Sequence, residues 1–237
     1  MHALTFIIQF QTAQFKKHLL KLFRGTYLIP PPSVVAGVFG AILGVDRWDL
    51  KEFCRRNGIM AGAELLGFDG YVSELARVWK LKGWREVITT IKRSEALYMP
   101  KYKFAVASSN PELIKEGMRR LSEYDFEYEV FGGNDYHFVN YIGEVRPAAV
   151  RKSRVANGYC PVDKFGELQV WDERAMIVPD YVHADVHERF VFVYGASIKA
   201  KEEMDVVDDG LSRVFVYNAA DFIAYEVKKP KRVRRRK

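Results

Sequence analysis

Apolar and polar residues alternate in segments that predict strands at the start, in the middle and in the last third of the chain. LTFIIQF, which ends near Phe10, has this pattern, and so does YKFAVAS at 102–108. From Tyr136 onward the pattern returns in YHFVNYIGEV, RFVFVYGAS, RVFVYN and FIAYEV, with turn residues between them. We therefore expect the last third of the chain to be mainly strand.

The stretch TYLIPPPSVVAGVFGAILGV, residues 26–45, carries no charge and invites three interpretations. A membrane helix needs roughly twenty residues that can all be helical, and Pro30–Pro32 leave too few. A phosphate-binding loop of the Walker type needs Lys and then Ser or Thr after its last glycine, where this chain has Val45 and Asp46. A dinucleotide fingerprint needs a strand leading into its first glycine, not three prolines. The sequence therefore disfavours all three.

The second half of this stretch predicts a short helix with one bulky and one bare face. Ser33 is its expected N-cap and Gly44 its expected end. We expect the bare face to pack closely on a sheet, with direct contact to a ligand as the alternative. The bare stripe consists of Gly37, Gly40, Ala41 and Gly44, and the opposite face of Val34, Val35, Val38, Phe39 and Ile42.

Two further helices and a long extended region complete the expected order. RWDLKEFCRRNG predicts a helix that ends at Gly58, and NPELIKEGMRRL predicts one that is capped by Asn110. Residues 59–94 are expected to be extended around a turn at Asp69 and Gly70, which suggests a projecting hairpin. Strand, helix, strands, helix, strand is the order of a ferredoxin-like α+β unit, which many RNA-recognition modules share.

Composition places the chain among folded proteins with few cysteines. Its 237 residues and 49% hydrophobic content suffice for a substantial core. Cys54 and Cys160 are too few for a disulfide framework or a zinc site, which favours a reducing, intracellular setting. The start, MHALTFIIQF, lacks the basic region and cleavage site of a signal peptide. We therefore expect a cytoplasmic protein without a membrane segment.

Positive charge is concentrated at the C-terminus. The final ten residues, KKPKRVRRRK, hold 8 of the 37 Lys and Arg, which leaves 29 bases and 30 acids in residues 1–227. The tail at 228–237 is expected to be a disordered arm that attracts phosphates without sequence preference. Within the body, bases recur over 77–93 and 146–154, and acids gather in EEMDVVDD at 202–209.

The pattern TY..PPPS...G..GAILG, which follows the first strand, resembles the signature of the Cas-five family within the CRISPR-associated RAMP superfamily. Phe15 and Lys16 match an aromatic and basic pair that precedes this signature. KRSEALYMPKYKFAV resembles the family's stretch leading into a third strand, and FGGNDYHFVNYIGEV its glycine loop and following strand. The resemblance covers most of residues 1–150. Many relatives have a basic residue directly after the second loop glycine, where this chain has Asn134 and Asp135.

The resemblance implies a division of the chain and a role in an RNA-guided complex. Residues 1–150 would form a ferredoxin-like (RRM-like) RAMP core with a β-hairpin thumb inserted at 67–98, and residues 151–227 a strand-rich C-terminal part. Its relatives are subunits of prokaryotic type I CRISPR surveillance (Cascade) complexes. They hold the 5′ handle of the crRNA, cap a filament of backbone RAMP subunits, contact the large subunit, and meet target DNA only indirectly. No cofactor and no metal are expected.

Groups that hold single-stranded RNA occur around the start of the predicted helix, in the thumb, at the glycine loop and in the strand that follows it. Amide donors, basic side chains and aromatic platforms are such groups. Gly132 and Gly133 are expected to leave backbone amides open. In the thumb, Trp79 and Trp84 accompany the bases, with a place in the core as the alternative. The candidate RNA-binding residues are Lys16, Lys17, Arg24, Tyr27, Ser33, Arg77, Lys80, Lys82, Arg85, Gly132, Gly133, Asn134, Tyr136, His137, Arg146 and Arg151.

A guide-processing endoribonuclease is the alternative function, since some relatives cleave precursor RNA without metal. The reaction needs a general base and a cation that stabilises the phosphorane. His137, beside Tyr136, is the candidate base, followed by His18, although a lone His in a strand more often makes a structural hydrogen bond. HADVHE at 183–188 lacks the order of a metal motif, and Cys54 lacks a partner His. A basic protein that acts through its tail at a nuclear or ribosomal surface is a third class, but it leaves the proline and glycine signature unexplained.

Overall fold

The structure is a computed structural model that describes residues 1–17, 23–83, 86–133, 136–183 and 187–223. Its helices are α1 (Pro32–Leu43), α2 (Leu50–Asn57), α3 (Pro111–Glu123) and a 3₁₀ helix, η1 (Ala219–Phe222). Its strands are β1 (His2–Phe10), β2 (Thr12–Ala13), β3 (Phe23–Arg24), β4 (Met60–Gly67), β5 (Gly70–Lys82), β6 (Glu86–Tyr98), β7 (Lys101–Ser108), β8 (Val139–Pro161), β9 (Phe165–Val170), β10 (Met176–His183), β11 (His187–Asp208), β12 (Arg213–Phe215) and β13 (Tyr217–Asn218). The expected α+β class is confirmed.

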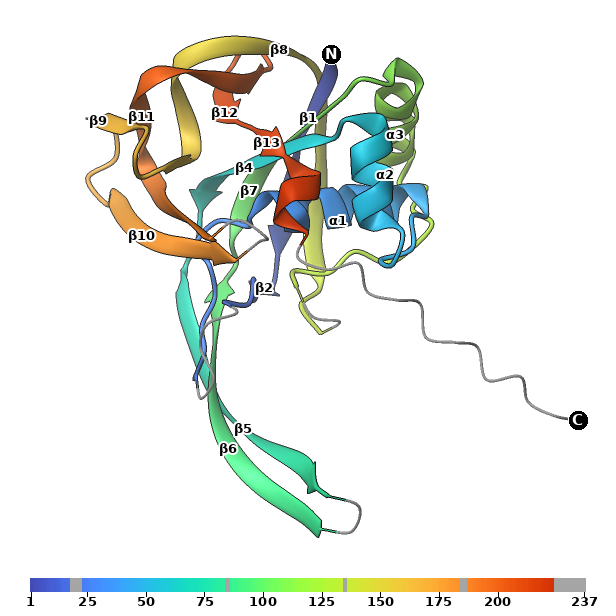
Figure 1. The fold of residues 1–237 in the computed structure, drawn as a ribbon, viewed down its shortest axis with the longest axis vertical. Coiled ribbons are helices and arrows are strands. Elements are labelled where there is room, and N and C mark those ends of the chain that lie inside the picture. The colour runs from blue at the N-terminus through green and yellow to red at the C-terminus, as the bar shows by residue number, and fades with distance from the viewer. Residues whose placement is uncertain (18–22, 84–85, 134–135, 184–186, 224–237) are drawn as a thin grey trace, which may run out of the picture.

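Four strands form the centre of the larger sheet, in the order β8-β1-β7-β4, and each neighbouring pair is antiparallel. Phe6 of β1 lies opposite Phe104 of β7, which in turn lies opposite Ala63 of β4. Along the chain the elements follow each other as β1, α1, β4, β7, α3 and β8. Helices α1 and α3 cover one face of these strands (Figure 1). The main core lies between that face and the helices.

The alternation in β1 buries both faces of this sheet. Leu4, Phe6 and Ile8 belong to the core under the helices. Ala3 faces the other way, into a smaller apolar cluster. The members of that cluster are Ala3, Ala105, Ala107, Val207, Val214 and Val216. The C-terminal strands therefore cover the sheet face opposite the helices.

Helix α1 begins and packs differently from the expectation. Its N-cap is Pro31 and not Ser33, because Pro32 supplies the fixed φ of the first helical position. Gly44 ends the helix in the left-handed conformation, as expected, with φ +82°. The bare stripe does not face a sheet. A Cβ on Gly40 would lie 2.9 Å from a side-chain carbon of Leu50, so the missing side chain lets α2 approach α1.

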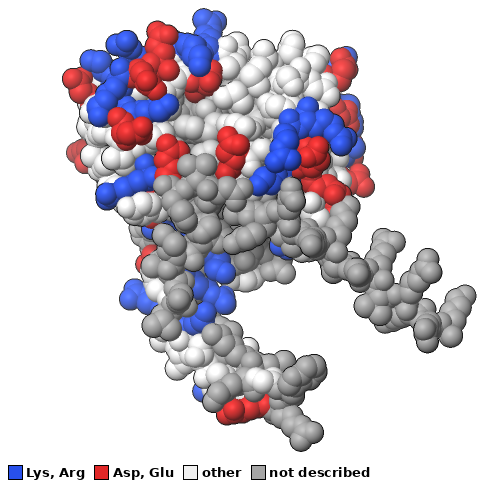
Figure 2. Space-filling model, viewed as in Figure 1, with Lys and Arg blue, Asp and Glu red and all other residues white. Residues whose placement is uncertain are grey.

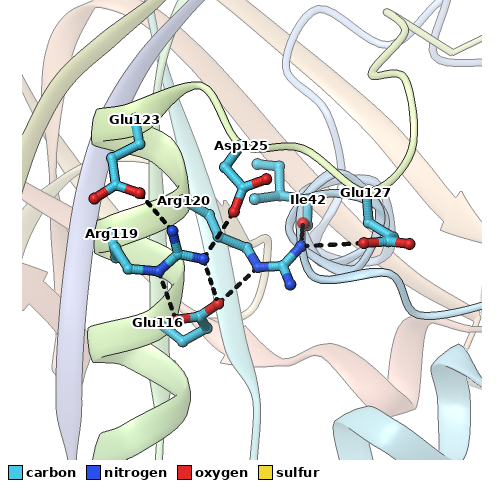
Figure 3. Close-up of polar contacts among 7 residues, drawn as sticks. All are labelled: Ile42, Glu116, Arg119, Arg120, Glu123, Asp125 and Glu127. Carbon is cyan, nitrogen blue, oxygen red and sulfur yellow. Dashed lines mark hydrogen bonds and ion pairs between the residues drawn. The ribbon is translucent and has the colours of Figure 1, made fainter.

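A network of charged side chains joins the end of α3 to α1 (Figure 3). Arg120 donates to the carboxylate of Glu116 at 2.8 Å and to the carbonyl oxygen of Ile42 at 3.1 Å, in the last turn of α1. Arg119 bonds to Glu116, Glu123 and Asp125. Hydrogen bonds from Arg119 and Arg120 lower the pKa of Glu116 to about 2. The network therefore remains charged at neutral pH and fixes the two helices to each other.

The locally encoded ends of the other helices are as expected. Helix α2 ends at Asn57 before a left-handed Gly58, and the side chain of Asn110 accepts a bond from the amide of Glu112 at the start of α3. The strand expected over FIAYEV is wrong where the structure describes it, because Ala219–Phe222 is a 3₁₀ helix. The last residues of FIAYEV, 224–227, lie outside the described residues, as does the basic tail at 228–237.

Strand β8 changes partner near its middle. It pairs with β1 up to Ala149 and with β11 from Ala149 to Pro161. The expected division between residues 150 and 151 lies beside this change of partner, within one continuous strand. The strand-rich character of the C-terminal part is confirmed, and its division from the rest of the chain stays a prediction.

Strands β5 and β6 form a long antiparallel hairpin that projects away from the body (Figure 1). They pair from Gly70↔Tyr98 to Lys82↔Glu86. The expected turn at Asp69 and Gly70 is not the turn of this hairpin, because β4 pairs with β7 and not with β5. The chain leaves the larger sheet at these residues, and the hairpin closes after Lys82.

Candidate nucleic-acid interface

Two short strands anchor the base of the hairpin. Thr12 of β2 lies opposite Tyr98, and Phe23 of β3 lies beside Arg93. The side-chain amide of Gln14, directly after β2, connects β6 and β3. Its nitrogen lies 2.7 Å from the Ser94 hydroxyl oxygen and 2.9 Å from the Glu95 carbonyl oxygen in β6, and 3.1 Å from the Arg24 carbonyl oxygen in β3. The hairpin base is therefore fixed, while the distal part extends beyond these contacts.

One face of the distal hairpin exposes apolar and cationic side chains together. The cross-strand pairs on this face are Leu75↔Arg93, Arg77↔Ile91 and Trp79↔Thr89. Leu75 is 77% exposed, Ile91 69% and Trp79 66%, and the Arg77 and Arg93 side chains are exposed too. The Trp79 ring is thus a surface residue, and the core alternative for it is wrong.

Cationic side chains lie on the half of the hairpin nearer the body. Figure 2 shows Lys and Arg side chains there. The guanidinium of Arg93 lies 5.8 Å from the ring centroid of Phe23 and donates to the Ser73 hydroxyl at 2.9 Å. A cationic, partly aromatic surface of this kind suits a phosphate backbone with unstacked bases.

The candidate residues before α1 differ in their accessibility. Lys16 is exposed, but Lys17 is ion-paired with Asp180. Tyr27 is 3% exposed, and its hydroxyl donates to the carbonyl oxygen of Tyr181 at 2.7 Å. Its ring belongs to the main core, which excludes the expected stacking of a base on it. Arg24 and Ser33 are half-buried in β3 and α1.

The glycine loop before β8 packs on the chain at residues 12–14. The amide of Gly132 donates to the carbonyl oxygen of His137 at 2.7 Å, so this amide is not open as expected. The carbonyl oxygen of Gly132 accepts a hydrogen bond from the backbone amide of Gln14 at 2.8 Å. Gly133 has φ +115°, and a Cβ there would lie 2.0 Å from the Gln14 carbonyl oxygen. The glycines thus allow close backbone packing.

Replacing Gly133 with alanine should destabilise this loop. The added Cβ needs a backbone conformation that is strained for a non-glycine residue and a displacement of Gln14. We expect a loss of about 1–3 kcal/mol in the free energy of unfolding, measured by chemical denaturation. The matched control is Gly67→Ala, because nothing lies within 4 Å of a Cβ at Gly67. Equal losses in both variants would contradict this explanation.

His137 is a buried residue at the base of the hairpin. It is 4% exposed, and its Nδ1 lies 2.6 Å from the Thr12 hydroxyl oxygen. Its Nε2 is buried and has no hydrogen-bond partner among the residues that the structure describes. Burial lowers the pKa of His137, and the nearby Glu74 carboxylate acts in the opposite direction. The imidazole is therefore neutral at pH 7.

A cavity of about 140 Å³ lies between this histidine and the hairpin. Thr12, Tyr136 and His137 line its body side. The hairpin side is formed by Val72, Glu74, Ser94 and Ala96, which lie on the opposite face from Trp79. Sequence analysis missed Thr12, Glu74 and Ser94, because only the strand register places these distant residues together.

Two of the basic residues of β8 form ion pairs with acidic residues of β11. The Lys152 ammonium lies 3.0 Å from the Asp205 carboxylate, and the Arg151 guanidinium 3.8 Å from that of Asp208. The acidic stretch at 202–209 therefore runs beside the basic strand. The Arg151 side chain is still 68% exposed, and Arg146 is exposed as well, so the expected role of both in RNA binding stays a prediction.

Several candidates cannot be placed. His18, Arg85 and Asn134 lie outside the described residues, and of Lys80 and Lys82 only the backbone, in β5, is described. Burial raises the pKa of both cysteine thiols to about 12, so they are protonated. The described part of the chain contains no group of three or more His, Cys, Asp or Glu that could hold a metal ion. None of its helices is long and apolar enough to cross a membrane.

Comparison with known proteins gives distant structural likenesses. No protein-family model and no curated protein matches the chain. A CRISPR RNA-guided surveillance complex is similar, at 11% identity and a TM-score of 0.46, over 83% of this chain and 91% of that chain. A Cas protein is similar at 13% identity and a TM-score of 0.41, over 84% and 95%. A CRISPR protein from Archaeoglobus fulgidus is similar at 9% identity and a TM-score of 0.48, over 91% and 99%.

All three names come from CRISPR systems, the class of protein that the opening motifs resemble. At these identities and TM-scores, no activity, ligand or partner of this chain follows from the likeness.

Proposed function

We propose that the chain is an RNA-binding subunit of a type I CRISPR surveillance (Cascade) complex. It holds the 5′ handle of the crRNA, caps the filament of backbone RAMP subunits, contacts the large subunit and meets target DNA only indirectly. The motifs of residues 26–45 and 131–145 support the family. The observation that carries RNA binding is the exposed face of the β5–β6 hairpin, where Trp79 lies beside Arg77.

We further propose that the body is a ferredoxin-like unit and that the hairpin is its thumb. The strand order β8-β1-β7-β4 and the placement of α1 and α3 on one face support this assignment. RNA-recognition modules of this architecture commonly stack bases on the open sheet face. Here valines of the C-terminal strands cover that face. RNA is therefore expected along the hairpin and not on the sheet.

The role is proposed to be non-catalytic. A reaction at the phosphate needs a cation close to the general base. Among the described residues that line the cavity beside His137, none is Lys or Arg. The short contact from His137 Nδ1 to Thr12 gives the ring a structural role. These observations favour a binding subunit over an endoribonuclease.

Binding of single-stranded RNA to the full chain tests the proposal. Trp79→Ala should weaken the affinity about 5- to 150-fold, since stacking of one base contributes about 1–3 kcal/mol. Trp171→Ala is the matched control, because Trp171 is 57% exposed on the body. We expect fluorescence anisotropy at constant salt to show a loss for Trp79→Ala alone. Equal affinities for both variants would count against the hairpin as the RNA site.

Incubation of the full chain with precursor RNA distinguishes a binding subunit from an endoribonuclease. In the presence of EDTA, precursor RNA should be recovered intact after incubation with the wild-type chain. Site-specific cleavage that is lost in His137→Ala would overturn the non-catalytic role.

A further inference from the structure

The cavity at the hairpin base has the size of one six-membered ring. Its volume of about 140 Å³ is smaller than the pockets of drug-sized ligands, which measure about 300–1,000 Å³. An engineered protein cavity of about 150 Å³ holds one benzene molecule. A single pyrimidine base is therefore of suitable size, whereas a nucleotide with its sugar is too large.

The walls of the cavity are suited to a planar ring. Val72 and Ala96 lie opposite each other in the strand register and supply an apolar wall. Tyr136, on the body side, is 53% exposed, and its ring centroid lies 4.5 Å from that of His137. An aromatic ring at the edge of a small cavity is a platform on which an unstacked base can rest.

The polar groups lie on the next cross-strand pair, Glu74↔Ser94. The Glu74 carboxylate is a hydrogen-bond acceptor when ionised. The Ser94 hydroxyl oxygen accepts a hydrogen bond from the side-chain amide of Gln14 at 2.7 Å. The hydroxyl proton of Ser94 can then be donated to another acceptor. One acceptor beside one donor matches a ring that carries an amine next to an acceptor. Cytosine has this pattern, with its N4 amine beside N3. Uracil offers only one N–H donor, at N3, and the carbonyl oxygens on both sides of it repel a carboxylate, so Glu74 favours the cytosine amine.

The Nε2 atom of His137 lacks a hydrogen-bond partner among the described residues but is fully buried, so it does not contact a base in the cavity. The other ring nitrogen is already engaged by Thr12. The polar groups that the cavity offers to a bound ring are therefore the Glu74 carboxylate and the Ser94 hydroxyl.

We propose that this cavity takes one cytosine base of the bound single-stranded RNA, with the Glu74 carboxylate accepting a hydrogen bond from its amine. The inference rests on the proposed RNA-binding function. In that function, the exposed hairpin face binds RNA without regard to sequence, and the cavity on the other face of the hairpin supplies a preference for one base. Glu74 is then a specificity-determining residue.

The test compares the affinities of the full chain for oligocytidylate and oligouridylate of equal length at one salt concentration. The wild-type chain should bind oligocytidylate about tenfold more tightly, the order expected of one good base contact. Glu74→Gln should abolish this preference, because a carboxamide can either donate or accept. Glu95→Gln is the matched control, since the Ser73↔Glu95 pair places it on the opposite face of the hairpin. This variant should retain the preference.

A second variant protects the test against misfolding of the first. Ala96→Leu fills the cavity from the apolar wall and should also abolish the preference while RNA is still bound. Binding of both RNAs with equal affinity by the wild-type chain, or a preference that survives both variants, would overturn the cytosine site and leave the binding function intact. Failure of the wild-type chain to bind either RNA would contradict the proposed function itself.

Discussion

Replacing Lys103 with methionine should lower the free energy of unfolding by about 3–5 kcal/mol. Lys103 lies on the sheet face opposite the helices, and its ammonium donates to the Asp209 carboxylate at 3.0 Å and to the Ser212 hydroxyl at 2.8 Å. The Asp209 side chain is 0% exposed. Methionine has a similar length but no charge, so the variant leaves a buried carboxylate without its cation.

The same variant should change the acid stability of the protein. Burial acts to raise the pKa of Asp209, but bonds from the Ser212 and Leu211 amides, Lys103 and Thr5 outweigh it and hold the value at about 2. The folded-state pKa is thus below the ordinary 3.8. The stabilisation by this carboxylate is complete above about pH 4 and is lost as the pH falls towards 2. Without Lys103 the folded-state pKa rises, so acid unfolding should begin at higher pH.

Chemical denaturation at neutral pH, followed by an acid titration, measures both effects. Lys199→Met is the matched control, because Lys199 makes an ion pair of the same 3.0 Å length with Glu167 on an exposed surface. Exposed pairs contribute about 0–1 kcal/mol, so this variant should lose little. Similar losses in the two variants would show that burial of Asp209 does not determine the stability.

The buried contacts around Lys103 and Asp209 also bear on where RNA can bind. Glu64 accepts bonds from Asn157 at 2.6 Å and from Ser212 at 3.2 Å, next to the bonds that Ser212 and Asp209 make with Lys103. Burial raises the pKa of Glu64, while Lys103 acts in the opposite direction. These contacts hold the loop after β11 against the sheet. The face that related architectures use for RNA is thereby closed, and the hairpin remains as the exposed surface.

The parts of the fold that the sequence predicts well are those encoded by neighbouring residues. Gly44, Gly58 and Asn110 define helix ends, because capping depends on one left-handed residue or one side chain. The alternation in LTFIIQF likewise identifies β1. The start of α1 was misplaced because Ser33 and the prolines both suit a helix N-terminus, and local preference does not choose between them.

The candidate site depends on contacts that are distant in sequence. Tyr27 belongs to an uncharged stretch whose burial becomes visible only in the fold. Arg151 is a basic residue in the sequence and an ion-paired one in the structure, because β11 returns beside β8. The pairing of Glu74 with Ser94 depends on the position of the hairpin turn. The sequence predicts that turn at Asp69 and Gly70, but it lies after Lys82. Strand register, more than residue type, therefore decided which candidates meet.

Shortening the hairpin should separate its two proposed contributions to RNA binding. Residues 76–92 are replaced by Asn-Gly, a two-residue turn that suits the directly opposed Leu75 and Arg93. We expect the affinity for single-stranded RNA to fall about 100-fold or more. The change removes the stacking platform of Trp79 and the charge of Arg77, which act on any sequence.

The shortened chain should remain folded, because Trp79 and Ile91, which lie in the replaced segment, are exposed and do not belong to the core of the body. Its thermal unfolding midpoint should stay close to that of the wild-type chain. The Glu74↔Ser94 pair and the cavity are retained, so the remaining binding should still favour oligocytidylate. Unchanged affinity would place the RNA elsewhere on the molecule, whereas a lost preference with a folded body would mean that the distal hairpin, and not the cavity, distinguishes the bases.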